Sequence, residues 1–224
     1  MRVAARRVVI EAAVDSLAAA IAAEQAGADR IELCGDLEVG GVTPAPDLQR
    51  DARRRIGIPL FTMVRPRGGS FTYRPDELDR MIAAIREARA LGAAGIVTGA
   101  IDGDGRIDRA AMRRLIAASR PLPVTFHKAF DALPDLGAGL EVLVELGVER
   151  VLTSGGAASA AAGAAAIGRL VARSAGRIGI VAGGGVSGAN VAVLVGKTGV
   201  SEVHARCERS GTRIRGIVAS LSGS

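Results

Sequence analysis

The sequence predicts a (β/α)8 barrel, an α/β fold in which eight parallel strands alternate with eight helices. One phrase occurs four times: the end of a helix, a glycine, and a short apolar strand that ends in polar residues. The glycines of the four copies are Gly27, Gly92, Gly147 and Gly199. They lie about 50 to 65 residues apart, which is the length of two strand–helix units, so four copies indicate an eightfold repeat.

The composition agrees with a barrel of this kind. The chain has 224 residues, of which 49% are apolar and only 2% are aromatic. This length suits one domain that spans residues 1–224. The interior of such a barrel is filled by branched aliphatic side chains, which this sequence supplies.

The other four strands are expected between the copies of the phrase, at residues 8–14, 60–65, 124–127 and 178–182. Pro59 and Pro123 stand directly before two of them, where a missing N–H does little harm to a sheet. The helices are expected at residues 17–26, 75–91, 108–118, 136–146, 157–174 and 190–197. The alanine-rich segment 157–174 is helical by propensity alone.

The C-terminal tail, from about residue 208, is expected to be irregular. It contains Gly211, Gly216 and Gly223 among several serines, which weakens a helix. The eighth helix is therefore expected to be short, displaced or missing. A partner chain would then cover the exposed flank, so the sequence favours a homo-oligomer.

Charge and cysteine content bear on partners and location. The net charge is +6, but the arginines are scattered along expected helices and few aromatic residues could stack on bases, which disfavours nucleic-acid binding. Two cysteines, Cys34 and Cys207, are too few for a disulfide framework. The N-terminus lacks the apolar core of a signal peptide, and no apolar run is long enough for a membrane span. We therefore expect a cytoplasmic protein.

Alternation of side chains along the strands predicts which residues face the barrel axis. Where apolar neighbours face the helices, the polar residues between them face inward. The inward set is Glu11, Glu32, Cys34, Arg65, His127, His204 and Arg206. In (β/α)8 barrels, chemistry takes place at the C-terminal ends of the strands, where this set converges.

Three interpretations of this set remain open. The first is a salt-bridged plug, in which Arg65 and Arg206 neutralise Glu11 and Glu32. The second is a copper site, because Cu(I) prefers thiolate, thioether and imidazole ligands. Its ligands would be Cys34, His127 and His204, with Met63 as a possible fourth. The carboxylates and histidines would suit a harder divalent ion equally well.

The third interpretation is an enzyme that acts on an anionic small molecule. Either glutamate could act as the general base, with His127 as acid or electrophile. The candidate catalytic residues are Glu11, Glu32, Arg65, His127 and His204. The loops after the seventh and eighth strands often hold phosphate in barrels, and a glycine triplet follows the seventh strand here. The candidate substrate-binding residues are Arg67, Lys128, Thr153, Ser154, Gly183, Gly184, Gly185 and Arg206.

The chain closely resembles the CutC family over roughly residues 8 to 206. The resemblance is carried by the segments 30–34, 40–44, 64–69, 123–127, 129–131, 150–155 and 183–185. It implies a cytosolic (β/α)8 barrel with a role in copper homeostasis and cysteine ligands near the mouth. This sequence departs from the family at Ala13, where a cysteine is common, at Ser70, where aspartate is usual, and at Lys128, where arginine is usual.

These observations lead to two expected functions. The first is a copper homeostasis protein of the CutC family that binds copper at the barrel mouth. The alternative is an enzyme of lyase or isomerase type that acts on a phosphorylated or carboxylated metabolite. The residues alone do not decide between a metal and a small molecule as the ligand.

Overall fold

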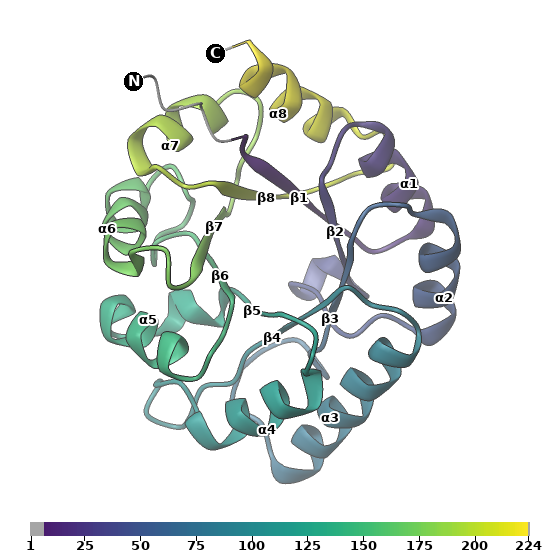
Figure 1. The fold of residues 1–224 in the computed structure, drawn as a ribbon, viewed down its shortest axis with the longest axis vertical. Coiled ribbons are helices and arrows are strands. Elements are labelled where there is room, and N and C mark those ends of the chain that lie inside the picture. The colour runs from purple at the N-terminus through teal and green to yellow at the C-terminus, as the bar shows by residue number, and fades with distance from the viewer. Residues whose placement is uncertain (1–6, 224) are drawn as a thin grey trace.

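The structure is a computed structural model that describes residues 7–223. These residues form a closed barrel of eight parallel strands with the helices arranged around it (Figure 1). The strands are β1 (Val9–Val14), β2 (Arg30–Leu33), β3 (Leu60–Met63), β4 (Gly95–Thr98), β5 (Val124–Phe126), β6 (Arg150–Thr153), β7 (Gly179–Gly183) and β8 (Glu202–Arg206). Each strand pairs with the next along the chain, and β8 closes the barrel on β1.

The helices alternate with the strands as the repeat predicts. They are α1 (Leu17–Gln25), α2 (Pro46–Arg55), α3 (Pro75–Ala90), α4 (Arg109–Ser119), α5 (Leu136–Glu145), α6 (Ala164–Ser174), α7 (Val191–Thr198) and α8 (Thr212–Ser222). Two 3₁₀ helices, η1 (Leu37–Val39) and η2 (Lys128–Ala132), follow β2 and β5. None of the helices within residues 7–223 is long and apolar enough to cross a membrane.

The four glycines of the repeated phrase share one structural role. Gly27, Gly92, Gly147 and Gly199 all have positive φ angles, between 70° and 93°. A residue in the left-handed backbone conformation directly after a helix turns the chain out of the helix, and glycine adopts this conformation without steric cost. The phrase is therefore a repeated helix stop, and it returns the chain to the bottom of the barrel for the next strand.

Side chains of the strands divide between two apolar regions. Ile10, Ala12 and Val14 of β1 belong to the large core between the strands and the helices. A separate, small cluster inside the barrel consists of Cys34, Phe61, Met63 and Val97. The alternation expected from the sequence therefore holds, and polar side chains share the barrel interior with only a few apolar ones.

The register of the strands sets the level of each inward residue. Glu11 of β1 pairs with His204 of β8, and Ala13 pairs with Glu32 of β2. Neighbours on adjacent parallel strands lie about 4.8 Å apart. Glu11, His204 and Glu32 are thus brought together although they are distant in the sequence.

Helix α6 begins later than the sequence predicts. The segment 157–163 forms turns, and the helix starts at Ala164. Gly163 lies against the backbone after β6, where a Cβ atom would come within 1.9 Å of the Ser154 carbonyl oxygen. Contacts at the mouth therefore override the helical propensity of the alanines.

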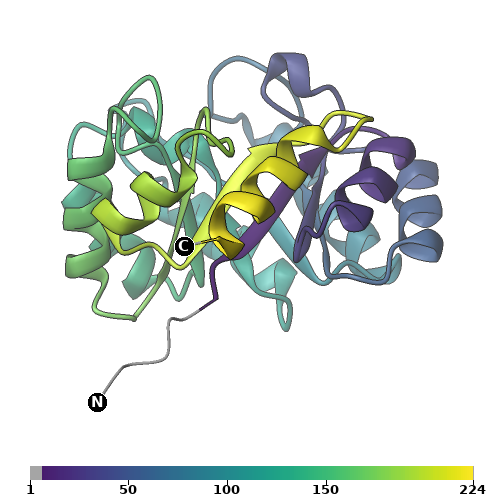
Figure 2. The same ribbon diagram turned by 90° about the horizontal axis from the view of Figure 1, so that it is seen from above.

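The expectation of an irregular tail is wrong. Residues Thr212–Ser222 form a regular helix, α8, which packs against β1 and β8 (Figure 2). A side chain at Gly188 would come within 2.5 Å of the carbonyl oxygen of Gly216, so small residues allow α8 to approach its neighbours closely. Because α8 covers this flank, the sequence argument for a homo-oligomer loses its basis.

If α8 belongs to the folded core, truncation of its buried face will destabilise the protein. Ile214 and Ile217 are fully buried, and Ile→Ala substitutions in cores cost about 2–5 kcal/mol. We expect Ile214→Ala to lower the free energy of unfolding by this amount in urea denaturation. The control Arg213→Ala, on the exposed face, should change it by less than about 0.5 kcal/mol. Equal stability of Ile214→Ala and the wild type would contradict the packing of α8.

Candidate active site at the barrel mouth

A cavity of about 190 Å³ lies at the C-terminal ends of the strands. Its walls are formed by Ala13, Glu32, Leu37, Gly40, Met63, Arg65, Phe71, His127, Lys128, Leu152, His204 and Arg206. A second hollow, of about 440 Å³, shares Gly40, Arg65, Phe71 and Lys128 with it and also reaches Asp131 and Ser154. The cavity is therefore the inner part of a depression over the mouth.

Glu11 is the centre of a buried chain of charged groups below this cavity. It is fully buried, and its Oε2 accepts a hydrogen bond of 2.5 Å from Arg30 Nε. Its Oε1 lies 2.8 Å from Nδ1 of His204. Although burial alone would raise the pKa of Glu11, the hydrogen bond with His204 and the charge of Arg30 lower it to about 2. Glu11 is therefore ionised and holds His204 in one orientation.

Arg30 was not among the residues singled out in the sequence. It bridges Glu11 and Glu202, with Nη2 donating 2.6 Å to Glu202 Oε2, and its guanidinium lies over the ring of Phe61. The salt-bridged plug expected from Arg65 and Arg206 does not form, because these two arginines have other partners. A buried ion pair does exist, but it is formed by Arg30 and Glu11 below the cavity. This ion pair does not include Glu32.

Glu32 lines the cavity and is only partly satisfied. Cys34 Sγ donates to its Oε1 at 3.4 Å, while its Oε2 is buried without a hydrogen-bond partner among the described residues. Burial raises the pKa of Glu32, and the nearby charge of Glu11 raises it further, against the opposing effect of His204. A carboxyl group with a raised pKa is suited to general acid–base catalysis near neutral pH.

His204 stands between the two carboxylates. Burial would lower its pKa, but the charges of Glu32 and Glu11 outweigh this effect and raise it. Because Nδ1 faces Glu11, Nε2 is the nitrogen left for the cavity wall. His204 is therefore oriented by a carboxylate in the way that catalytic histidines commonly are.

His127 has the opposite character. Its Nδ1 accepts a hydrogen bond of 3.2 Å from the backbone N–H of Ala129, at the start of η2. Burial and the charge of Arg65 lower its pKa to about 3, so the ring is neutral and carries its proton on Nε2. This Nε2 is buried and has no partner within residues 7–223. Gly99 makes room for the ring, since a Cβ there would approach it to 2.8 Å.

Arg65 is buried in the wall of the cavity, and its guanidinium donates to backbone carbonyls instead of to a carboxylate. Its Nη1 donates to Val39 O at 3.0 Å and Gly41 O at 3.1 Å, and its Nη2 donates to Gly69 O at 2.8 Å. These bonds hold the loops after β2 and β3 over the mouth. The guanidinium also interacts with the hydroxyl group of Tyr73. The Phe71 ring centre lies 4.6 Å from Arg65 Cζ and 4.9 Å from the ring centre of His127, to which the ring is tilted by 49°.

The remaining cations expected at the mouth differ in their roles. Arg67 points away from the cavity and pairs with Glu77, with Nε 2.6 Å from Oε1. Arg206 lines the cavity but pairs with Glu38 of η1. Lys128 lines both hollows, and within residues 7–223 its Nζ forms no ion pair. Of the three, Lys128 is therefore the cation open to a ligand.

The hydroxyl groups of Thr153 and Ser154 are not available to a ligand, because both donate hydrogen bonds to the carboxylate of Asp131. The carboxylate of Asp131 accepts from Thr153 Oγ1 at 2.5 Å, from Ser154 Oγ at 2.9 Å and from the backbone N–H of Gly156 at 3.0 Å. The backbone N–H of Ser154 donates to the same carboxylate. Asp131, which sequence reasoning did not single out as functional, ties η2 and its neighbour His127 to the end of β6.

The glycine triplet forms the end of β7 and the turn that follows. Gly183 faces His204, and a Cβ there would come within 2.5 Å of Leu152 Cδ1. Gly184 and Gly185 have φ angles of 107° and 71°. Their carbonyls are used inside the protein, since Gly184 O accepts from Ala160 N and Gly185 O accepts from the side chain of Asn190. The glycines therefore serve a tight turn and close packing.

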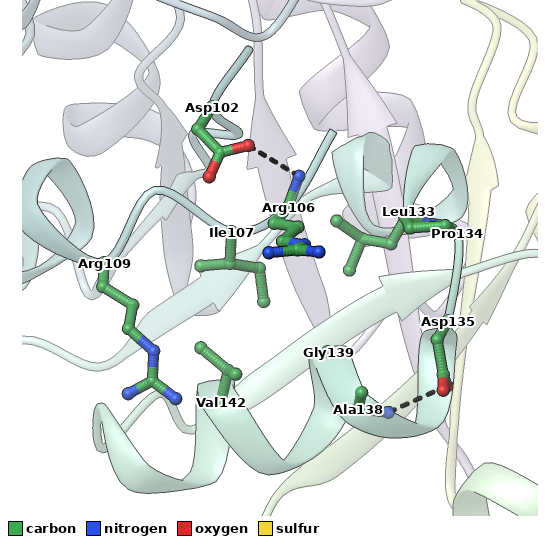
Figure 3. Close-up of a pocket in the computed structure, with 10 residues that line it drawn as sticks. All are labelled: Asp102, Arg106, Ile107, Arg109, Leu133, Pro134, Asp135, Ala138, Gly139 and Val142. Atoms are coloured by element: carbon green, nitrogen blue, oxygen red, sulfur yellow. Dashed lines mark hydrogen bonds between the residues drawn. The ribbon is translucent and has the colours of Figure 1, made fainter. Parts of the chain in front are cut away.

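A further hollow, of about 360 Å³, lies outside the barrel, between α5 and the segment after β4 (Figure 3). It is larger than the cavity of about 190 Å³ at the mouth. Its wall is mainly apolar, with Ile107, Leu133 and Val142. Asp102 accepts the backbone N–H of Arg106, and Asp135 caps α5. Because its carboxylates have these structural roles, the chemistry is better placed at the smaller cavity in the mouth.

The residues at the mouth do not fit the Cu(I) site suggested by the sequence. Burial, with the adjacent Glu32, holds the pKa of the Cys34 thiol well above its ordinary range, and Cys34 Sγ donates a hydrogen bond to Glu32. The ligand atoms that lie within 4.8 Å of one another, among the described residues, belong to Glu11, Glu32 and His204. Glu11 already binds Arg30 and His204, so this group offers a cation few free atoms.

The fold and the cavity define a (β/α)8 barrel with a buried polar site at its C-terminal mouth. The chain matches the CutC family over residues 8–209. It is 45% identical over 214 residues to the human copper homeostasis protein cutC homolog, covering 96% of this chain and 78% of the relative. It is 46% identical to a CutC family protein of Xylella fastidiosa, covering 88% of this chain and 73% of that protein.

Solved structures agree. The crystal structure of CutC from Streptococcus agalactiae is 33% identical, with a TM-score of 0.85, and the match covers 88% of this chain and 97% of that one. Thiamine phosphate pyrophosphorylase from Pyrococcus furiosus, at 15% identity and a TM-score of 0.62, shares the fold alone. The protein belongs to the CutC family.

The buried ion pair predicts a pH-dependent effect of Arg30→Met. Removing one partner of such a pair costs about 3–5 kcal/mol. The folded-state pKa of Glu11 is depressed from 4.5 to about 2, so its contribution to stability is present above pH 4.5 and is lost as the pH falls toward 2. We expect the wild type to be more stable than Arg30→Met near pH 7, and this difference to shrink on acidification.

Urea unfolding between pH 7 and pH 2 measures this effect. Arg50→Met is the matched control, because Arg50 forms an exposed ion pair with Asp47 and should cost less than about 1 kcal/mol at any pH. A difference between wild type and Arg30→Met that does not depend on pH would contradict the role given to Glu11.

Proposed function

We propose that this protein takes part in copper homeostasis, the role after which its curated relatives are named, and that its mouth is an active site for proton transfer on a small carbonyl compound. The observation that carries the second part is a pair of buried polar atoms that have no hydrogen-bond partner among the described residues and belong to side chains of one cavity wall. They are Glu32 Oε2 and His127 Nε2. Buried polar groups are normally hydrogen-bonded, so such a pair indicates a bound ligand.

The chemistry of these atoms is complementary. Neutral His127 presents an N–H donor that can polarise a carbonyl oxygen, which favours loss of a proton from the adjacent carbon. Glu32, whose pKa is raised by burial, can accept that proton. His204, held by Glu11, can return a proton to another atom of the substrate. This arrangement supports an isomerase or lyase reaction.

Direct copper binding is the second candidate function. It is favoured by the contact of two sulfur-bearing side chains, Cys34 and Met63, inside the barrel. It is opposed by the protonated state of the Cys34 thiol and by the positive charges of Arg30 and Arg65 nearby.

The two free thiols of the chain support a reducing, cytosolic location.

Deuterium exchange tests the proposed reaction without knowledge of the substrate. Wild-type protein is incubated in D2O with pools of small keto and hydroxy acids, and mass spectrometry detects compounds that gain deuterium. We expect incorporation with the wild type and at least a hundredfold slower incorporation with Glu32→Gln, since general acid–base catalysis contributes about 10²–10⁴-fold. Arg50→Met, which changes an exposed residue of α2 that does not line the cavity, is the control and should match the wild type.

A Cu(I) titration of the same proteins, against a competing chelator, distinguishes the two candidates. The proposal expects weak binding that is unchanged by Cys34→Ser. Tight stoichiometric binding that is lost in Cys34→Ser, together with no deuterium incorporation by the wild type, would overturn the enzyme proposal in favour of a copper site.

A further inference from the structure

In two of the loops at the mouth, those after β6 and β8, the groups that could bind an anion already hold a carboxylate of the protein itself. In the loop after β6, Asp131 accepts from two hydroxyl groups and from the backbone N–H groups of Ser154 and Gly156. This is the arrangement of donors that commonly surrounds a phosphate group. Because Asp131 fills it, the loop has no vacant anion site.

The loop after β8 repeats this situation. Glu208 Oε1 accepts from the backbone N–H of Arg213 at 2.9 Å and from Ser210 Oγ at 3.1 Å, at the first turn of α8. In many (β/α)8 enzymes, the loops after the last two strands and a helix N-terminus bind the phosphate of the substrate. Here Glu208 takes that place in the loop after β8, so a phosphate bound there would meet a like charge.

Positive charge remains inside the cavity itself. Arg65 is buried, and it contacts three backbone carbonyls but no carboxylate. Lys128 Nζ, free of ion pairs within residues 7–223, lies close to the turn after β7, where a Cβ on Gly184 would be 3.7 Å from it. Among the described residues, these two cations at the small cavity have no acidic partner, whereas the deeper Arg30 pairs with both Glu11 and Glu202.

The size and lining of the cavity restrict the ligand further. Its volume of about 190 Å³ is below the range of roughly 300–1,000 Å³ that is typical of sites for drug-sized ligands. Leu37, Met63, Phe71 and Leu152 give it apolar walls. The donor His127 Nε2 and the acceptor Glu32 Oε2 lack partners in the same wall.

We propose that the substrate is a small, unphosphorylated hydroxy or oxo carboxylic acid. Its carboxylate binds between Lys128 and Arg65, and its hydroxyl or carbonyl oxygen meets Nε2 of His127. This inference rests on the proposed function, and it selects one of the two substrate classes that the sequence leaves open. It also assigns Lys128 as the residue that recognises the carboxylate.

Matched pairs of acids test this assignment. Binding of glycolate and 2-phosphoglycolate, of glycerate and 3-phosphoglycerate, and of inorganic phosphate to the full chain is measured by calorimetry. We expect at least one unphosphorylated acid to bind, and its phosphorylated counterpart to bind no more tightly. Lys128→Gln should weaken binding at least tenfold, because it removes the charge while keeping a similar length.

The sequence supplies a matched control, because Lys128 and Lys197 are its only lysines. Lys197 is exposed near the end of α7, and Lys197→Gln should bind like the wild type. The bound acid should also protect Lys128, and not Lys197, from chemical acetylation measured by mass spectrometry. This labelling experiment needs no variant, so it remains informative if Lys128→Gln folds poorly.

Three results would overturn the inference. Phosphorylated acids that bind at least tenfold more tightly than their parents would refute the substrate class, while the deuterium exchange of the wild type would still support the proposed function. Unchanged binding by Lys128→Gln, with no protection of Lys128, would refute the assigned residue. Binding of no acid and no phosphate would refute the inference, and the proposed function would fall with it only if the wild type also gave no deuterium incorporation.

Discussion

The site depends on a single buried carboxylate, that of Glu11. It contacts Arg30 on one side and His204 on the other, so it joins the charged layer in the lower part of the barrel to the polar wall of the mouth. Without Arg30, the charge of Glu11 would be buried uncompensated, which is costly. Without Glu11, His204 would have no partner to fix its orientation. The closed barrel imposes this arrangement, because strand register places Glu11 beside His204.

The two histidines of the chain are placed in opposite electrostatic settings. His204 lies between carboxylates, which favour its protonated form, whereas His127 lies near Arg65 and accepts a backbone N–H, which favours the neutral ring. Two titratable groups whose surroundings push their pKa values apart are a common sign of divided acid–base roles. A soft-metal site would instead need both rings and the Cys34 sulfur to converge on one point, and their hydrogen bonds to Glu11, Ala129 and Glu32 direct them elsewhere.

Much of this could be predicted from the sequence, because a barrel repeats one rule. The glycine phrase predicts the strands, and alternation along them predicts that Glu11, Glu32, His127 and His204 face inward. The same alternation also points Arg30 inward. The hydrogen-bond partners of these side chains could not be predicted, because they depend on strand register and on loop conformation. Arg65 donates to three backbone carbonyls, and the hydroxyl groups of Thr153 and Ser154 donate to the carboxylate of Asp131. The eighth helix was missed because glycine lowers helix propensity, whereas Gly216 permits close packing on Gly188.

The central claim is that the mouth pairs a neutral His127, whose proton lies on Nε2, with a His204 whose pKa is raised by the neighbouring carboxylates. Because the chain contains two histidines, long-range ¹H–¹⁵N NMR of the imidazole rings across pH 3 to 9 can observe both, with His204→Gln to assign the signals. The account predicts that His127 keeps the neutral Nε2–H form down to about pH 3 and that the pKa of His204 lies above 6.5. A His127 ring that titrates near 6.5, or that carries its proton on Nδ1, would contradict it.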